Sequence, residues 1–249
     1  MTIGSSGMYT SRIFRAAQIR KGDHVIPKTA QLSDLSAESL ELVAEGGERY
    51  VYKSRDFPEF LFKKQKRVDE RRLKKRDLKS FLLRVLPSYR THIVRKEYRA
   101  YVSAVLRQQA TWPDFPTTML HGFTFLDGEP IQVVENVTLE GRDIGPSLRE
   151  LLADDLFDAA ALDALNVFGM ALLRSDIPTN DVNASNIVLG SNRDGTRRFI
   201  LVDGFGDIHL VPFRTYSSFV RKRHLVRLFS KLGKNRLAFD PKTFAFSLR

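Results

Sequence analysis

The sequence predicts a protein of the α+β class, with a small antiparallel β-sheet in its first half and mainly α-helices in its second half. Short segments rich in β-branched and aromatic residues, separated by turn signals, fall between residues 40 and 137. One long helical pattern interrupts these segments at residues 93–108, and a second follows them at residues 158–173. With 249 residues, 43% of them hydrophobic, the chain can bury one large core or two modest lobes.

The first expected element is a strand, turn and strand over residues 40–53, with Gly46 and Gly47 at the turn. Glycine lets backbone N–H groups approach a ligand closely, so such a turn can close over phosphates. A short strand at residues 59–63 follows and ends in Lys63, where a lysine that pairs with phosphate would be needed. Glycine turns and lysines at strand ends are also common where they have no binding role.

The next element is a helix over residues 93–108, whose apolar residues recur at helical spacing and can pack on a sheet. Glu97 lies beside that apolar face. It can reach back to Lys63 and hold the ammonium group toward a nucleotide, or it can balance the basic residues next to it in the helix. The sequence leaves both interpretations open.

A strand at residues 131–137 leads into a segment with glycine and proline at residues 141–146, which interrupts both periodicities and marks a boundary between lobes. We therefore expect a flexible N-terminal arm at residues 1–38, one lobe at 39–137 and a second lobe at 138–249. The start of the arm is polar and basic and lacks the apolar block of a secretory signal.

Two loops in the second half carry the most specific pattern. Asp181 is followed by four spacers and Asn186, and an apolar strand pattern at residues 199–202 ends at Asp203 and Gly204. Taken alone, the residues between these loops predict a β-hairpin with its turn at residues 191–195. The pair of loops is also typical of protein-kinase-like phosphotransferases, in which one carboxylate orients the attacking hydroxyl and oxygen ligands hold Mg²⁺.

The composition restricts the partners and the compartment. A net charge of +11 implies attraction to polyanions, and the densest basic block, residues 63–76, is a candidate contact with an anionic surface. That block has no aromatic residues to stack on bases, so nucleic acid ranks last among the partners. The chain has no cysteine and no apolar run of about 20 residues, so we expect a cytoplasmic protein without a transmembrane segment.

A basic amphipathic pattern near residues 221–232 fits either a helix on a membrane surface or a core helix with a basic outer face.

Across residues 40–231 the chain resembles the bacterial YrbL family of kinase-like proteins, a family of the PhoP regulatory network. The resemblance is carried by residues 46–52, 95–101 and 185–188, and by the tail through residues 202–203, 211–212 and 221–223. It implies a two-lobed protein-kinase-like fold that binds ATP and Mg²⁺. The implied reaction is phosphate transfer to a hydroxyl of an unknown small-molecule, envelope-sugar or protein acceptor.

The resemblance also implies roles for residues in the first lobe. Gly46 and Gly47 would lie over the phosphates. Lys63 would pair with the α- and β-phosphates, and Glu97 would hold it in place.

In the second lobe, the resemblance implies that Asp181 orients the acceptor hydroxyl and that Asn186 and Asp203 hold Mg²⁺. Backbone groups near Glu135 and Val137, where the lobes join, would meet adenine.

The chain departs from the kinase pattern at several positions. Ala44 and Arg49 stand where a full G-x-G-x-x-G loop has glycine, and Asn183 stands where many kinases keep a lysine. No A-P-E segment follows the metal loop. The alternative is therefore a pseudokinase, a regulatory or binding module without catalytic turnover.

Overall fold

A computed structural model of the chain describes residues 32, 35–47, 49–66, 92–107, 115–175, 177–179, 181–192, 194–205, 218–233 and 236–249. Residues 32–249 form one compact unit. The start of the predicted arm, residues 1–31, lies outside the described residues, as do residues 67–76 of the basic block and residues 211–212 of the resemblance.

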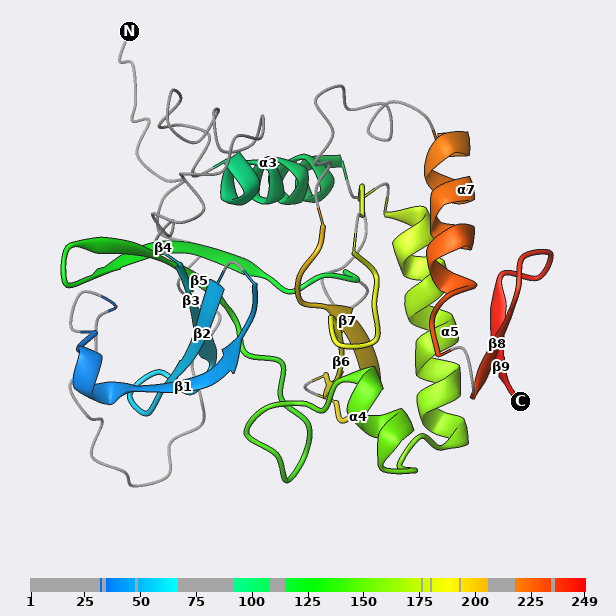
Figure 1. Ribbon diagram of the computed structural model, residues 1–249, viewed down its shortest axis with the longest axis horizontal. Helices are drawn as coiled ribbons and strands as arrows, with labels where there is room; N and C mark the ends of the chain where they lie inside the picture. The colour runs from blue at the N-terminus through cyan, green and yellow to red at the C-terminus, as the bar shows by residue number, and fades with distance from the viewer. Residues whose placement is uncertain are drawn as a thin grey trace, which may run out of the picture. The chain divides into compact units, whose positions relative to one another are not determined.

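The first part of this unit is a five-stranded antiparallel sheet with one long helix (Figure 1). The strand order is β1-β2-β3-β5-β4, and the helix α3 comes between β3 and β4 in the chain. The elements are β1 (Leu40–Glu45), β2 (Arg49–Ser54), β3 (Phe60–Gln65), α3 (His92–Arg107), β4 (Leu120–Leu126) and β5 (Glu129–Glu135). The strands and the helix expected in the first half are confirmed.

Strand β4 is an element that the sequence pattern did not predict. Its pairing with β5 shifts register between Leu120 and Gly122, and Gly122 has a φ of 119°. Such a bulge interrupts the alternation that identifies a strand in sequence.

The two faces of β3 point to different surroundings. Phe62 is fully buried in an apolar cluster with Ile131 and Val133, and Leu35 and Phe57 belong to the same cluster. Lys63, the next residue along the strand, points to the opposite face because successive side chains alternate. Lys63 pairs with Val51 and Gln132 and does not end the strand, which continues to Gln65.

The residues just before β1 belong to the sheet's packing. Leu35 is buried, and the Thr124 Oγ1 donates a hydrogen bond to the carbonyl of Leu32 at 2.9 Å. The end of the predicted arm therefore contacts the strands.

The second part of the unit is built mainly from helices. Its elements are α4 (Leu148–Ala153), α5 (Ala159–Arg174), β6 (Ile187–Ser191), β7 (Arg197–Leu201), α7 (Ser218–Phe229), β8 (Leu237–Asp240) and β9 (Ala245–Leu248). Asp158 caps α5 by accepting a hydrogen bond from the Ala161 N–H at 2.7 Å. The β6–β7 hairpin is the one predicted, and the long helix is confirmed within a residue at each end. The predicted α+β class, with an antiparallel sheet first and mainly helices after it, is therefore the observed one.

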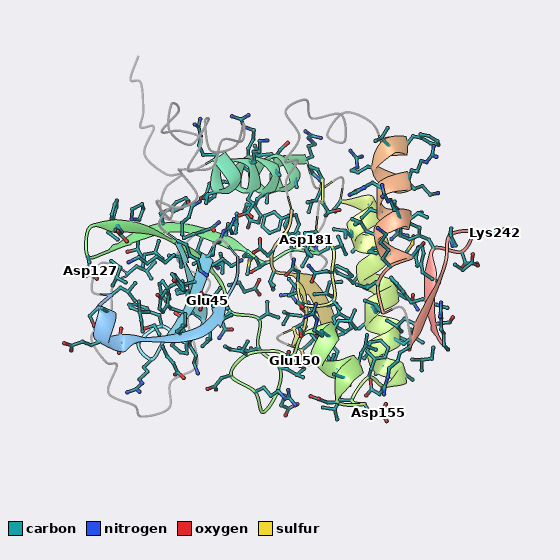
Figure 2. All side chains as sticks on the ribbon, viewed as in Figure 1. Glu45, Asp127, Glu150, Asp155, Asp181 and Lys242 are labelled. Atoms are coloured by element: carbon teal, nitrogen blue, oxygen red, sulfur yellow. The ribbon has the colours of Figure 1, made fainter. Side chains whose placement is uncertain are left out.

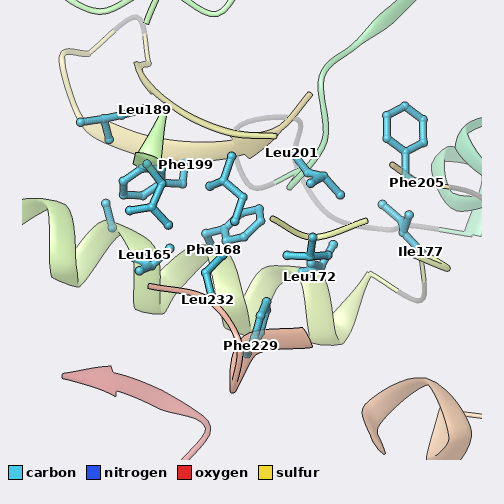
Figure 3. Close-up of a cluster of buried hydrophobic side chains, with 14 of the residues drawn as sticks. Leu165, Phe168, Leu172, Ile177, Leu189, Phe199, Leu201, Phe205, Phe229 and Leu232 are labelled. Carbon is cyan, nitrogen blue, oxygen red and sulfur yellow. The ribbon is translucent and has the colours of Figure 1, made fainter. Parts of the chain in front are cut away.

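One apolar core connects both parts. Leu165, Phe168 and Leu172 of α5 pack against the β6–β7 hairpin and against Phe229 (Figure 3). The same cluster includes Tyr101 of α3. The two parts of the unit consequently share one core.

The basic helix α7 belongs to this core. Leu225, Phe229 and Leu232 are almost completely buried, while Lys222 and Arg223 are exposed. Of the two interpretations open from sequence, the core helix with a basic outer face is the observed one. No helix in the described part of the chain has the length and hydrophobicity that crossing a membrane requires.

Candidate active site

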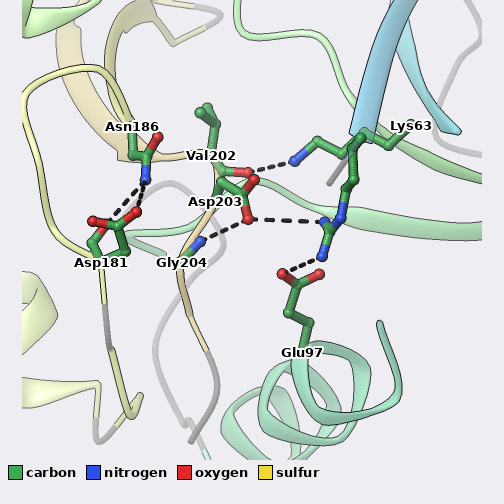
Figure 4. Close-up of polar contacts among 8 residues, drawn as sticks. Lys63, Glu97, Asp181, Asn186, Val202, Asp203 and Gly204 are labelled. Atoms are coloured by element: carbon green, nitrogen blue, oxygen red, sulfur yellow. Dashed lines mark hydrogen bonds and ion pairs between the residues drawn. The ribbon is translucent and has the colours of Figure 1, made fainter. Parts of the chain in front are cut away.

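The polar residues predicted from distant parts of the sequence converge where β3, α3 and the β6–β7 hairpin meet (Figure 4). Lys63 Nζ donates to the carbonyl of Val202 at 2.6 Å, and Val202 directly precedes Asp203. In the view of Figure 2, Asp181 lies between the five-stranded sheet and α5. The site therefore contains side chains from both parts of the unit.

Backbone hydrogen bonds hold the two predicted loops against each other. The Asp181 N–H donates to the Gly204 carbonyl at 3.2 Å, and the Val202 N–H donates to the Asn186 carbonyl at 2.9 Å. Thr179 and Phe205 form an antiparallel bridge beside them. Asp181 and Asp203 are thus positioned by main chain, which is more rigid than side-chain contact alone.

Gly204 permits this close approach. Its φ is 80°, and a Cβ atom at this position would lie 2.6 Å from the Asp181 carbonyl oxygen. Any other residue would have to adopt the left-handed conformation and push Asp181 away.

Both carboxylate oxygens of Asp181 accept hydrogen bonds from asparagine side chains. Asn183 Nδ2 donates to Oδ1 at 2.8 Å, and Asn186 Nδ2 donates to Oδ2 at 3.2 Å. The Asn183 Oδ1 accepts from the Ser185 N–H at 2.9 Å and from the Asn186 N–H at 3.2 Å, an Asx turn that fixes its side chain. Asp181 itself is exposed, so an acceptor can reach its carboxylate.

Asn183 is a site residue that the sequence analysis treated only as a departure from the kinase pattern. Its position in the site comes from the Asx turn. The signal for that turn was present, since asparagine commonly hydrogen-bonds the backbone two residues further along.

Glu97 has a different ion partner from the one expected. It pairs with Arg49, whose Nη2 lies 2.6 Å from the Glu97 Oε1, and both side chains are buried. Lys63 is buried as well, but its ammonium group faces the Val202 carbonyl. Arg49 is long enough to reach Glu97 from the start of β2, so it takes the partner that the sequence pattern assigned to Lys63.

The pKa values of Glu97, Lys63 and Asp203 are all shifted, and burial is the largest single influence on each. It raises the pKa of Glu97 to about 7, although Arg49 acts in the opposite direction. Burial also lowers the pKa of Lys63, and the nearby Asp203 partly offsets this. Asp203 is only partly buried; this partial burial acts to raise its pKa, but Lys63 and Arg49 outweigh it and the pKa lies below its ordinary value.

The raised pKa of Glu97 predicts a pH-dependent stability. Between its ordinary pKa of 4.5 and about 7, the folded protein keeps a proton that the unfolded chain has lost. The free energy of unfolding should therefore fall as pH rises through this window, by at most about 1.4 kcal/mol per pH unit. Glu97→Gln should remove this fall, as measured by urea unfolding at a series of pH values.

The comparison between variant and wild type isolates Glu97 from other groups. His121, whose pKa burial lowers, contributes a slope of the opposite sign that is the same in both proteins. An identical pH profile in the two proteins would refute the assignment of this effect to Glu97.

The donor set fits Mg²⁺. The Asp203 side chain is 42% exposed, and its lowered pKa keeps it a carboxylate at neutral pH. Asn186 turns its amide nitrogen to Asp181, so its Oδ1 is directed away from that carboxylate (Figure 4). No cluster of three or more His, Cys, Asp or Glu that could hold a metal occurs among the described residues. The two oxygen donors of Asp203 and Asn186 match the needs of Mg²⁺, which usually takes one or two protein oxygens and completes its shell with phosphate and water.

The segment predicted to meet adenine is tied into the protein. The Glu135 N–H donates to the Met119 carbonyl at 2.9 Å, and the Val137 carbonyl accepts from the Gly145 N–H at 2.7 Å. The side chain of Val137 is buried with Val188 and Ile200. The Val137 side chain is therefore held in a small apolar cluster, and the adenine contact itself stays a prediction.

The turn between β1 and β2 is closed by a hydrogen bond from the Gly46 N–H to the Arg49 carbonyl at 2.9 Å. A Cβ atom at Gly47 would meet nothing within 4 Å. Gly47 therefore faces open space, where a ligand can approach.

A separate cavity of about 1050 Å³ lies between α5 and the β6–β7 hairpin. It is lined by Phe115, Val167 and Phe199 among others and includes none of the predicted site residues.

Comparison with known proteins gives one family and a set of solved structures. Residues 34–236 match the family described as PhoP regulatory network protein YrbL. One solved structure that matches is the crystal structure of a kinase domain, PF14_0431, at 13% identity and a TM-score of 0.40; the match covers 72% of this chain and 53% of that one. The chain thus spans about half the length of that kinase-domain chain. No curated protein matches. Since the family match extends over most of its length, the chain belongs to the PhoP regulatory network protein YrbL family.

Proposed function

We propose that this protein is a Mg²⁺- and ATP-dependent phosphotransferase that acts on a hydroxyl group of an acceptor. The observation that supports this best is the convergence of Lys63, Asp181, Asn186 and Asp203, from three separate segments, on one site where the lobes meet. Phosphoryl transfer requires mainly positioning and electrostatic stabilisation, and these residue types supply both.

In this proposal Asp181 orients the acceptor hydroxyl and accepts its proton. The hydrogen bonds from Asn183 and Asn186 fix the rotation of the Asp181 carboxylate, so its oxygens meet the hydroxyl in a single orientation. Lys63 contacts the nucleotide phosphates, and Asp203 and Asn186 would hold the metal. Bound MgATP would supply the phosphoryl group, and its metal ion would neutralise the negative charge on the phosphates.

The test is a calorimetric titration with ATP in the presence of Mg²⁺ and in EDTA. The wild type should bind at least about tenfold more tightly with Mg²⁺, and Asp203→Asn should lose this difference. Asp163→Asn is the matched control, since it makes the same charge change at an exposed position on α5. Absence of any magnesium-dependent affinity in the wild type would remove the proposal.

A smaller effect is expected at Asn183. Asn183→Ala removes one of the two side-chain hydrogen bonds to the Asp181 carboxylate, so turnover should fall about tenfold while ATP affinity stays the same. Turnover is measured as phosphate released or transferred from labelled ATP. A variant with unchanged turnover would show that Asn183 does not position Asp181.

The alternative is a pseudokinase that binds a partner without turnover. Two observations favour it, namely the buried Arg49 beside Asp203 and the neutral Asn183 where many kinases keep a lysine. Incubation with labelled ATP and a panel of hydroxyl acceptors distinguishes the two functions. Any phosphate transfer that depends on Asp181 contradicts the pseudokinase.

A further inference from the structure

Arg49 is a buried cation inside the candidate site. Its residue exposure is 7%, although arginine is almost always at the surface unless it is paired. A buried guanidinium is costly without compensating partners, so its position must be stabilised by specific contacts.

Two carboxylates surround this guanidinium. Nη2 lies 2.6 Å from the Glu97 Oε1, and Nη1 lies 3.8 Å from the Asp203 Oδ1. The same Asp203 oxygen accepts a hydrogen bond from the Gly204 N–H at 2.7 Å. Arg49 therefore faces the oxygen of Asp203 that the Gly204 N–H holds in place.

The sheet register places Arg49 beside Lys63. Arg49 pairs with Gln65, and Val51 pairs with Lys63, in the antiparallel β2–β3 ladder. Directly paired residues and residues two apart on one strand share a face of the sheet, so Arg49 and Lys63 project from the same face. Arg49 also follows the open glycine turn closely in the chain.

We propose that Arg49 is a second phosphate-binding cation and that, without nucleotide, it takes the place of the metal beside Asp203. This inference rests on the proposed function. A guanidinium presents a planar fork of donors that matches phosphate oxygens, which a single ammonium cannot do.

The proposal has two consequences for nucleotide binding. Arg49 adds to the affinity for nucleotide phosphates when no metal is bound. A metal at Asp203 must share that carboxylate with Arg49, so the cation and the metal oppose each other. Arg49 consequently makes nucleotide binding less dependent on Mg²⁺ than it would otherwise be.

The experiment measures ATP affinity in EDTA and in Mg²⁺ for the wild type and for Arg49→Gln. In EDTA the variant should bind ATP about 10-fold to 100-fold more weakly. In Mg²⁺ its affinity should stay within about threefold of the wild type, because the metal no longer meets a competing cation. The ratio of the two affinities should therefore rise at least about threefold.

The controls separate charge, fold and site. Lys64→Gln makes the same charge change next to Arg49 in the sheet, but Lys64 points to the other face and pairs with Glu129, so this variant should behave as wild type. Arg49→Gln leaves Glu97 without this ion partner, so the double variant Arg49→Gln, Glu97→Gln is measured as well. A phosphate role predicts the same loss in EDTA in the double variant.

Each outcome bears on a definite claim. Equal losses in EDTA and in Mg²⁺, or recovery of the EDTA affinity in the double variant, would show that Arg49 is only a structural partner of Glu97. A wild type that binds ATP in neither condition would refute the proposed function and this inference together. If the wild type binds ATP more tightly in Mg²⁺ and the Arg49→Gln variant binds ATP in EDTA as tightly as the wild type does, this inference alone is refuted.

Discussion

Asp181→Ala is expected to lower kcat by about 10³-fold or more while ATP affinity in Mg²⁺ stays within about twofold. Removing a group that accepts a proton only during the reaction affects turnover and leaves ground-state binding intact. Asp181 is exposed, so its truncation leaves no cavity in the core. The measurement combines phosphate transfer from labelled ATP with calorimetric ATP binding.

The control for Asp181→Ala is the melting temperature, which should change by only a few degrees because an exposed side chain contributes little to packing. A variant that keeps more than about one tenth of the wild-type turnover would exclude Asp181 as the residue that accepts the proton.

Gly204→Ala is expected to disturb both loops of the site at once. The added methyl group meets the Asp181 carbonyl oxygen at 2.6 Å, and the residue must keep a φ of 80°. Together these should lower the free energy of unfolding by about 2–4 kcal/mol and abolish magnesium-dependent ATP affinity. Urea unfolding and calorimetry measure the two effects.

Gly195→Ala is the matched variant for this prediction. Gly195 has a φ of 83° at the tip of the β6–β7 hairpin, but a Cβ atom there meets nothing within 4 Å. Its substitution should cost only about 1 kcal/mol of backbone strain and leave ATP affinity intact. Equal effects of the two substitutions would show that strain alone, and not the contact with Asp181, governs the behaviour of Gly204.

The two glycines illustrate the limit of prediction from sequence. Both follow an aspartate, and as letters they are equivalent turn residues. Only Gly204 lies against another part of the chain, the Asp181 backbone, and such a contact depends on where two distant loops meet. The sequence could therefore indicate a turn at each glycine but could not rank their importance.

Local patterns were sufficient for most secondary structure. The periodicity of α3 and α5 and the turn signals of the β1–β2 and β6–β7 hairpins predicted these elements to within a residue or two. Strand β4 was missed because Gly122 at its bulge breaks the alternation. The bulge is accommodated because β4 pairs with β5, and the sequence of β4 alone does not show which strand it pairs with.

The amino-acid sequence by itself determined the fold class, the two loops with Asp181 and Asp203, and the strand lysine Lys63, because each depends on residues close together in the chain. Only the tertiary structure decided which charged side chains pair with one another. The register of β2 on β3 and the packing of α3 placed Arg49, not Lys63, against Glu97. Ion pairing depends on distances of a few ångströms between side chains from separate elements, and only the folded arrangement of those elements fixes such distances.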